Sequence, residues 1–368
     1  MRYGLSILTT FLFAVALHAH DAPPFNDALT RKDIIRVMTA AADWQLAHPS
    51  KHPAYDWTQA PFYIGLNAFA PISGDAPKYL AAVRRNGEEN KWRPGTRPLC
   101  ADDHAITQSY FMLHAAQPDP AIIKPSLDTL SQVSLFPYDE SLEFENWEKT
   151  WRQWTWCDSL FMSPPAYVLA GKATGDRAYV DFMNKMWWKV TDFLYDKEEH
   201  LYFRDSRFFD QRSANGKKIF WSRGNGWVLA GLARVLQDMP ADYPQRKRYE
   251  TLFREMSAKV AAIQDTDGYW KSNLLDPKAT PLPETSGTAF FIYGLAWGVN
   301  HGLLDRAVYE PTIRKGWSAV VRAMHPDGKL GWVQMIGDQP GDTSADGTEI
   351  YGVGALLLAG SEVQKLSK

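Results

Sequence analysis

Asp158 is the residue whose surroundings best suit acid–base chemistry. It lies in the string Trp-Thr-Trp-Cys-Asp-Ser-Leu-Phe-Met, residues 154–162, between tryptophans and an apolar run. A carboxyl group among tryptophans is partly removed from water, which raises its pKa and suits it to donate a proton. An aspartate at this point can equally cap a helix, with backbone N–H groups as its partners. The residue types alone leave both interpretations open.

Two adjacent acids, Asp102 and Asp103, are followed by His104 and precede a second segment of mainly small and apolar residues. Acids at the start of a helix are favourable partners of its dipole, and this alone would explain them. Two carboxyl groups that face each other are, however, the usual equipment for acid–base catalysis on sugars. We therefore predict that Asp158 and Asp103 are catalytic and that Asp102 and His104 contact the substrate, with Asp102 as the alternative catalytic partner.

The string Trp-Ser-Arg-Gly-Asn-Gly-Trp, residues 221–227, is the most specific in the chain. Its glycines allow a backbone to approach a ligand closely, and Arg223 offers a planar fork for a carboxylate. Trp221 and Trp227 present flat faces that suit the C–H groups of a sugar ring. We predict that Trp221, Arg223, Asn225 and Trp227 bind substrate. The alternative is a tight turn with two core tryptophans and a structural arginine.

Four further residues are weaker candidates for substrate binding. Arg204 belongs to a polar cluster with aromatic flanks at residues 202–208, which is also compatible with a solvated loop and surface ion pairs. Trp57 and Tyr63 lie near the start of an apolar segment, and Trp332 lies shortly before another. Core packing would explain these three aromatic residues equally well.

The composition excludes several classes of protein. The 368 residues include 40 basic and 42 acidic ones, a net charge of -2, which rules out a general nucleic-acid binder. No nucleotide-binding or metalloprotease motif is present and the histidines lack the spacing of metal ligands, so we expect no cofactor and no metal. With 15 Trp and 16 Tyr, an aromatic-lined cleft is expected. Cys100 and Cys157 each precede a candidate acid, either as buried free thiols or, if the segments are neighbours, as a disulfide.

The N-terminus has the features of a secretory signal. A positive start at Arg2 is followed by an apolar run over residues 5–17 and by the small residue Ala19. We predict a signal peptide over residues 1–19, export to the periplasm, and no membrane anchor after cleavage. The apolar run is too short to span a bilayer.

Two kinds of helical segment alternate along the rest of the chain. Six amphipathic stretches are typical of partly exposed helices, and six others begin with polar or glycine residues and continue with almost no charge, as buried helices do. From Asp103, through Asp158, Arg223 and Ser286, to Glu349, the intervals are 55, 65, 63 and 63 residues. This repeat predicts an all-α (α/α)6 barrel, formed by residues 20–368 as a single domain, in which the polar starts of six inner helices meet at one end. The predicted outer helices are 27–46, 76–85, 120–133, 176–194, 243–263 and 309–324.

The strings at residues 221–227, 156–162 and 103–104 resemble those of the unsaturated uronyl hydrolases of glycoside hydrolase families 105 and 88. The likeness is closer to family 105 and extends through Pro-Glu-Thr-Ser-Gly-Thr at 283–288 to Glu-Ile-Tyr-Gly at 349–352. The resemblance implies an (α/α)6 barrel that acts on oligosaccharides left by polysaccharide lyases. These carry a C4=C5 double bond in a galacturonyl or glucuronyl residue at the non-reducing end.

By this resemblance, Asp158 protonates C4 and activates the water that adds at C5, and the resulting hemiketal falls apart. Asp103 would position the sugar hydroxyls and tune Asp158, while Arg223 and neighbouring tryptophans would bind the uronate. Many members have a histidine in the segment where this chain has Arg204, and an extra arginine would suit an acidic substrate.

Three other functions remain open at this stage. An ordinary inverting glycosidase would use two carboxylates about 6.5–9.5 Å apart around a water molecule. A helical-barrel polysaccharide lyase would need a Tyr or His base beside a neutralising group, and no such pair stands out. A secreted binding protein with a degenerate site is the third. The favoured prediction is an unsaturated uronyl hydrolase that takes an acidic oligosaccharide and works as a monomer.

Overall fold

The computed structural model describes residues 25–367, and helices dominate this part of the chain. The predicted signal peptide lies outside the described residues, so it stays a prediction. Two short strands, β1 (Tyr195–Asp196) and β2 (Leu201–Tyr202), pair antiparallel in a small hairpin. No helix among residues 25–367 is long and apolar enough to cross a membrane.

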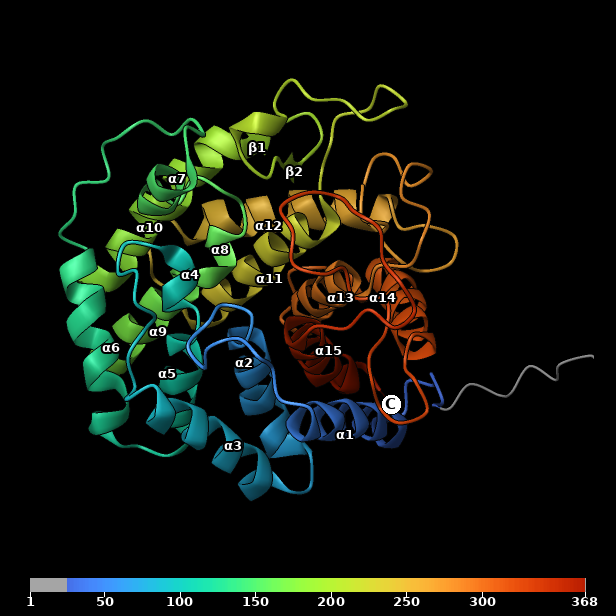
Figure 1. The fold of residues 1–368 in the computed structure, drawn as a ribbon, viewed down its shortest axis with the longest axis horizontal. Coiled ribbons are helices and arrows are strands. Elements are labelled where there is room, and N and C mark those ends of the chain that lie inside the picture. Colours follow the sequence, from blue (N-terminus) through green and yellow to red (C-terminus); the bar gives the residue numbers. More distant parts are fainter. Residues whose placement is uncertain (1–24, 368) are drawn as a thin grey trace, which may run out of the picture.

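Six buried helical segments form a closed inner ring. Each contacts the next in chain order, and the last packs against the first, which closes the ring. In Figure 1 the red α15 accordingly lies beside the blue α2. The inner helices are α2 (Ala60–Phe69), α5 (Thr107–Ala116), α9 (Pro164–Thr174), α11 (Ser222–Asp238), α13 (Thr285–Asn300) and α15 (Ile350–Val363).

Six amphipathic helices surround this ring, and each packs on one or two inner helices. Side chains of Thr30, Asp75, Asp119, Asp176 and Asp305 accept hydrogen bonds from backbone N–H groups and begin five of them. The predicted (α/α)6 barrel is therefore confirmed, with helix starts that differ from the predicted ones by up to four residues. The outer helices are α1 (Arg31–Ala47), α3 (Ala76–Glu89), α6 (Pro120–Val133), α10 (Arg177–Leu194), α12 (Arg246–Ala262) and α14 (Arg306–Arg322).

Two of the predicted inner helices are interrupted near their polar starts. The short α4 (Ala101–His104) precedes α5, and the short α8 (Ser159–Met162) precedes α9. At the second break, Pro164 and Pro165 begin a new helix because proline lacks the N–H that would continue the previous one. The breaks leave both predicted catalytic segments as single turns at the mouth of the barrel. Four shorter helices complete the fold: α7 (Trp147–Gln153), η1 (Ala70–Ile72), η2 (Ser206–Phe208) and η3 (Gln364–Leu366).

Glycines allow the inner helices to approach one another closely. A Cβ atom at Gly354 of α15 would lie 2.3 Å from the carbonyl carbon of Pro61 in α2. Residues at or just before the starts of α2, α4 and α8 line one cavity, so these helices begin at the same end of the barrel. Each N-terminus carries partial positive charge. The helix N-termini thus add some positive potential to the mouth of the barrel.

Candidate active site

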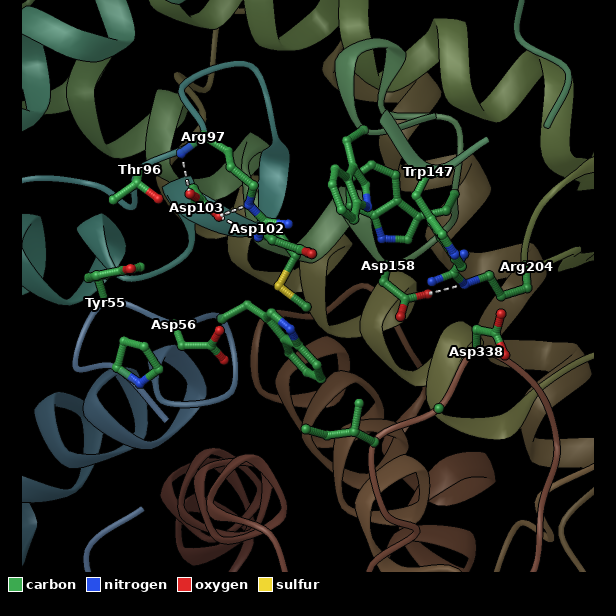
Figure 2. Close-up of a pocket in the computed structure, with 17 residues that line it drawn as sticks. Tyr55, Asp56, Thr96, Arg97, Asp102, Asp103, Trp147, Asp158, Arg204 and Asp338 are labelled. Atoms are coloured by element: carbon green, nitrogen blue, oxygen red, sulfur yellow. Dashed lines mark hydrogen bonds and ion pairs between the residues drawn. The ribbon is translucent and has the colours of Figure 1, made fainter. Parts of the chain in front are cut away.

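A cavity of about 560 Å³ opens at the mouth of the barrel, where the inner helices begin (Figure 2). Loops before α2, α4 and α15, together with α7, α8 and the segment after β2, form its wall. Its lining combines five acids, two arginines and four tryptophans with small and apolar residues. The lining residues are Pro53, Tyr55, Asp56, Trp57, Thr96, Arg97, Asp102, Asp103, Trp147, Trp151, Trp156, Asp158, Met162, Arg204, Ile336, Gly337 and Asp338.

Asp158 lies in the wall of this cavity and is only 7% exposed. It immediately precedes α8, but its side chain makes no capping hydrogen bond, so the capping interpretation is wrong. The Cys157 thiol donates a hydrogen bond of 3.3 Å to Asp158 Oδ1. Burial raises the pKa of Asp158, and the nearby charge of Arg204 opposes that shift. A carboxyl group with a raised pKa is better suited to donate a proton than an ordinary aspartate.

The two adjacent acids have different partners. Asp103 Oδ1 accepts hydrogen bonds from Arg97 Nε at 3.0 Å and Arg97 Nη2 at 2.5 Å, and Oδ2 accepts one from the Arg97 backbone N–H at 2.6 Å. Figure 2 shows this pair on the side of the cavity opposite Arg204. Asp102 has no such partner, and burial raises its pKa to about 7, with a further rise from the charge of Asp158. Asp102 is therefore the less constrained carboxyl group near Asp158.

Replacing Asp102 with Asn is expected to stabilise the fold at pH 8 but not at pH 3.5. In the unfolded chain the Asp102 carboxyl has a pKa near 3.9, below its value in the folded protein. As the pH rises from about 4 to 7 it therefore ionises more readily in the unfolded chain, and the free energy of unfolding falls. A shift of about three pKa units sets an upper limit of roughly 4 kcal/mol for the gain on removing this carboxyl group. Denaturant unfolding at the two pH values measures it. The matched variant Asp103→Asn weakens the Arg97 bonds and should destabilise at pH 8; equal effects of both variants would contradict this assignment.

Arg204 contacts both Asp158 and a second buried acid, Asp205. Its Nε lies 3.7 Å from Asp158 Oδ1, and its Nη1 donates to Asp205 Oδ2 at 3.0 Å. Its guanidinium lies over the ring of Trp147, 4.9 Å from the centroid. Arg204 is 7% exposed, and its Nε has no hydrogen-bond partner among the described residues. A cation so placed is ready for an anionic ligand, and the solvated-loop interpretation is wrong.

The string at residues 221–227 lies behind the cavity wall instead of in it. Arg223 is fully buried and donates to the carbonyls of Gln334 at 2.6 Å and Met335 at 3.0 Å. Trp221 donates to Gln334 Oε1, while Asn225 bonds to the backbone of Tyr202. Direct contact of this string with a ligand is therefore not what the geometry supports. Arg223, Trp221 and Asn225 hold the wall in place through these bonds to neighbouring segments, whereas Arg223 Nε and Trp227 Nε1 have no hydrogen-bond partner among the described residues.

Of the remaining five predicted binding residues, one lines the cavity and four do not. Trp57 lines the cavity and stacks on Tyr351, with ring centroids 5.5 Å apart. His104 is buried behind it and bonds to Ser163 Oγ and the Pro98 carbonyl. The fully buried Trp227, the half-buried Tyr63 and Trp332 do not line the cavity either, in line with the core-packing alternative.

The residues that sequence reasoning missed come mainly from irregular segments. Trp147 and Trp151 lie one helical turn apart on α7, and their rings stack with centroids 6.2 Å apart. Arg97 lies over Trp151 at 4.6 Å. The density of tryptophan between residues 147 and 156 was the only signal for this wall. Tyr55, Asp56, Arg97 and Asp338 lie in loops, where no periodic pattern exists to mark them.

Cys100 and Cys157 are both buried free thiols, as in the first of the two alternatives. Within residues 25–367 no group of three or more His, Cys, Asp or Glu side chains is arranged to hold a metal ion.

Comparison with known proteins identifies the family. The sequence profile described as Glycosyl Hydrolase Family 88 matches residues 32–367. The chain belongs to glycosyl hydrolase family 88. The resemblance of the motifs to the unsaturated uronyl hydrolases of families 105 and 88 is therefore confirmed.

Relatives of this family 88 protein cover almost its whole length. The unsaturated 3S-rhamnoglycuronyl hydrolase of Formosa agariphila is 41% identical over 92% of this chain and 93% of its own. The protein of the same name from Alteromonas sp. (strain LOR) is 36% identical over 89% of this chain and 85% of its own. A solved structure described as a polysaccharide lyase is 32% identical, with a TM-score of 0.83 over 91% of this chain and 98% of that one. The family 88 chain is thus a glycoside hydrolase whose acids meet in one cavity.

Proposed function

We propose that this protein removes a 4,5-unsaturated uronic acid from the non-reducing end of lyase-generated oligosaccharides, by hydration of the C4=C5 double bond. The observation that carries this proposal is the buried Asp158, whose pKa burial raises, beside the cationic Arg204 in one cavity. The relatives are named unsaturated rhamnoglycuronyl hydrolases, which favours rhamnose as the sugar next to the uronic acid.

The electrostatics of the cavity fit an anionic sugar. Arg204 offers its unpaired Nε to a carboxylate that would approach Asp158, and the inner-helix N-termini add positive potential. A uronate bound there would also place negative charge near Asp158 and favour its protonated form. Substrate binding therefore supports the proton donor that the reaction needs.

Asp158 is the group that we assign to both proton transfers. Its proton passes to C4, and positive charge develops at C5, next to the ring oxygen. The resulting carboxylate then takes a proton from a water molecule, whose oxygen bonds to C5. The C5 hemiketal opens by breaking its bond to the ring oxygen, and the hemiacetal at C1 releases the next sugar as an alcohol. Asp158 ends the cycle protonated.

Asp102 is the group that we assign to sugar positioning, with Asp103 held by Arg97. A carboxyl group that titrates near neutrality can accept or donate a hydrogen bond to a sugar hydroxyl. The charge of Asp158 adds to the rise in the pKa of Asp102, so the two acids are electrostatically coupled.

Ultraviolet absorbance with lyase-generated oligosaccharides tests the proposal. The conjugated enol-ether carboxylate absorbs, and hydration destroys that chromophore, so absorbance should fall to the baseline with this protein. The matched control is the same oligosaccharide after chemical removal of the double bond, which should not be cleaved. Release of reducing ends from saturated glycans without absorbance loss would favour the inverting glycosidase. A rise in absorbance on an intact polysaccharide would indicate a lyase and overturn the proposal.

A further inference from the structure

Asp205 is fully buried and directly follows Arg204, but it does not line the cavity. Its carboxylate accepts four hydrogen bonds. Oδ1 accepts from the Arg207 backbone N–H at 3.1 Å and from Arg207 Nε at 2.8 Å. Oδ2 accepts from Arg207 Nη2 at 2.8 Å and from Arg204 Nη1 at 3.0 Å. A carboxylate has about four acceptor sites, so all those of Asp205 are filled.

The two arginines bond to this carboxylate in different ways. Arg207 uses Nε and Nη2, the edge of a guanidinium that forms two parallel hydrogen bonds with a carboxylate. Arg204 uses Nη1 alone, and neither its Nε nor its Nη2 donates a hydrogen bond to any side chain or carbonyl of residues 25–367. The paired edge is therefore occupied in Arg207 and free in Arg204.

We propose that Asp205 is a positioning residue, which holds Arg204 by one nitrogen so that its free Nε–Nη2 edge receives the carboxylate of the terminal uronic acid. This inference rests on the proposed function and extends it to the orientation of the arginine that binds the uronate. Because Asp205 lies outside the cavity lining, it acts through Arg204 and not on the substrate.

Three further contacts fix Arg204 in this orientation. Its backbone carbonyl accepts a hydrogen bond of 2.9 Å from the N–H of Cys157, the residue before Asp158. Its guanidinium lies over the ring of Trp147, 4.9 Å from the centroid, and its Nε lies 3.7 Å from Asp158 Oδ1 (Figure 2). A side chain that is already fixed loses little conformational freedom when it binds an anion, so the free edge binds more tightly than that of a mobile arginine.

Arg207 keeps the edge of Arg204 free. An empty acceptor site on Asp205 would attract a second nitrogen of Arg204, and a ligand could then no longer use that nitrogen. Arg207 prevents this because it fills three of the four sites. Arg207 is itself held, since its Nη2 also donates to Asp338 Oδ2 at 2.8 Å and its guanidinium lies 4.0 Å from the ring centroid of Phe144.

The test compares an unsaturated disaccharide as the free acid with its methyl ester, which keeps the double bond and the chromophore but lacks the negative charge. The wild-type protein should have a KM about thirtyfold lower for the acid than for the ester. In Asp205→Asn the amide has one acceptor oxygen for two arginines, so Arg204 is no longer held. KM for the acid should rise about tenfold and KM for the ester at most about twofold, with kcat within about threefold of the wild type. A merely structural role would change KM for both substrates alike.

Arg207→Gln is a second variant, which leaves Asp205 and Arg204 in place. It empties two acceptor sites on Asp205, and Arg204 then turns its free edge toward them, so KM for the acid should again rise severalfold and KM for the ester should not. The matched control is Arg212→Gln, which changes a nearby arginine that donates to backbone carbonyls. It should leave both KM values within about twofold of the wild type.

An unchanged ratio of the two KM values in Asp205→Asn would overturn the inference, and if that variant does not fold, an unchanged ratio in Arg207→Gln would do so. Equal KM of the wild type for acid and ester would overturn it as well. Failure of the proposed function looks different, because the wild-type protein would then leave the absorbance of both substrates unchanged.

Discussion

The Asp158→Asn variant is expected to lose at least about a thousandfold in kcat on unsaturated oligosaccharides, or roughly 4 kcal/mol of transition-state stabilisation. The amide keeps the shape of the side chain and can still bond to Cys157 or Arg204, but it cannot deliver a proton to C4. Absorbance loss under saturating substrate measures kcat, and binding of the substrate to the variant should persist.

Stability is the control for this experiment. Burial disfavours the ionised form of Asp158, as the raised pKa indicates, so the neutral amide should leave thermal unfolding at pH 7 unchanged or shifted upward. The loss of activity then cannot be attributed to unfolding. If Asp158→Asn kept kcat within tenfold of the wild type, another group would have to donate the proton and the assignment would be wrong.

The Arg204→Lys variant is expected to raise KM for the unsaturated uronide by about thirtyfold, or roughly 2 kcal/mol. Lysine keeps a positive charge near Asp158 and Asp205, which protects the fold from an unpaired buried acid. It loses the planar fork and the stacking on Trp147, and with them the paired hydrogen bonds to a carboxylate. Steady-state kinetics over a range of substrate concentrations separate KM from kcat.

Arg152→Lys is the matched control for this exchange. Arg152 lies on α7, beside the tryptophans of the cavity, but pairs with Glu140 and Glu148 and does not line the cavity. Its replacement should leave KM within twofold of the wild-type value. Similar KM values for all three proteins would show that the guanidinium of Arg204 does not bind the uronate.

The helical barrel could be predicted from the sequence because the patterns that mark its helices are local and recur along the chain. Six amphipathic helices and six nearly uncharged ones alternate along the chain, and capping residues such as Thr30 and Asp176 mark where the outer helices begin. A helix that is apolar all round has to be buried, so the alternation alone separates an inner ring from an outer one. Asp158 could be placed at the mouth for the same reason, since it lies at the start of an inner segment. Arg204 was only a weaker candidate, because its polar cluster was equally compatible with a solvated loop.

The different environments of adjacent residues such as Asp102 and Asp103 were decided by the tertiary structure alone. Asp102 and Asp103 are the same residue type at consecutive positions, and only the fold places Arg97 on Asp103 and leaves Asp102 near Asp158. The Arg223 guanidinium could bind a carboxylate, but in the fold it donates hydrogen bonds to two backbone carbonyls of the loop before α15. Sequence by itself thus determined the barrel and the end at which its polar residues meet, because periodicity and capping are local properties. Which of those residues face the ligand depended on contacts between segments more than 100 residues apart, such as Arg223 with Gln334 and Arg207 with Asp338, which no local pattern encodes.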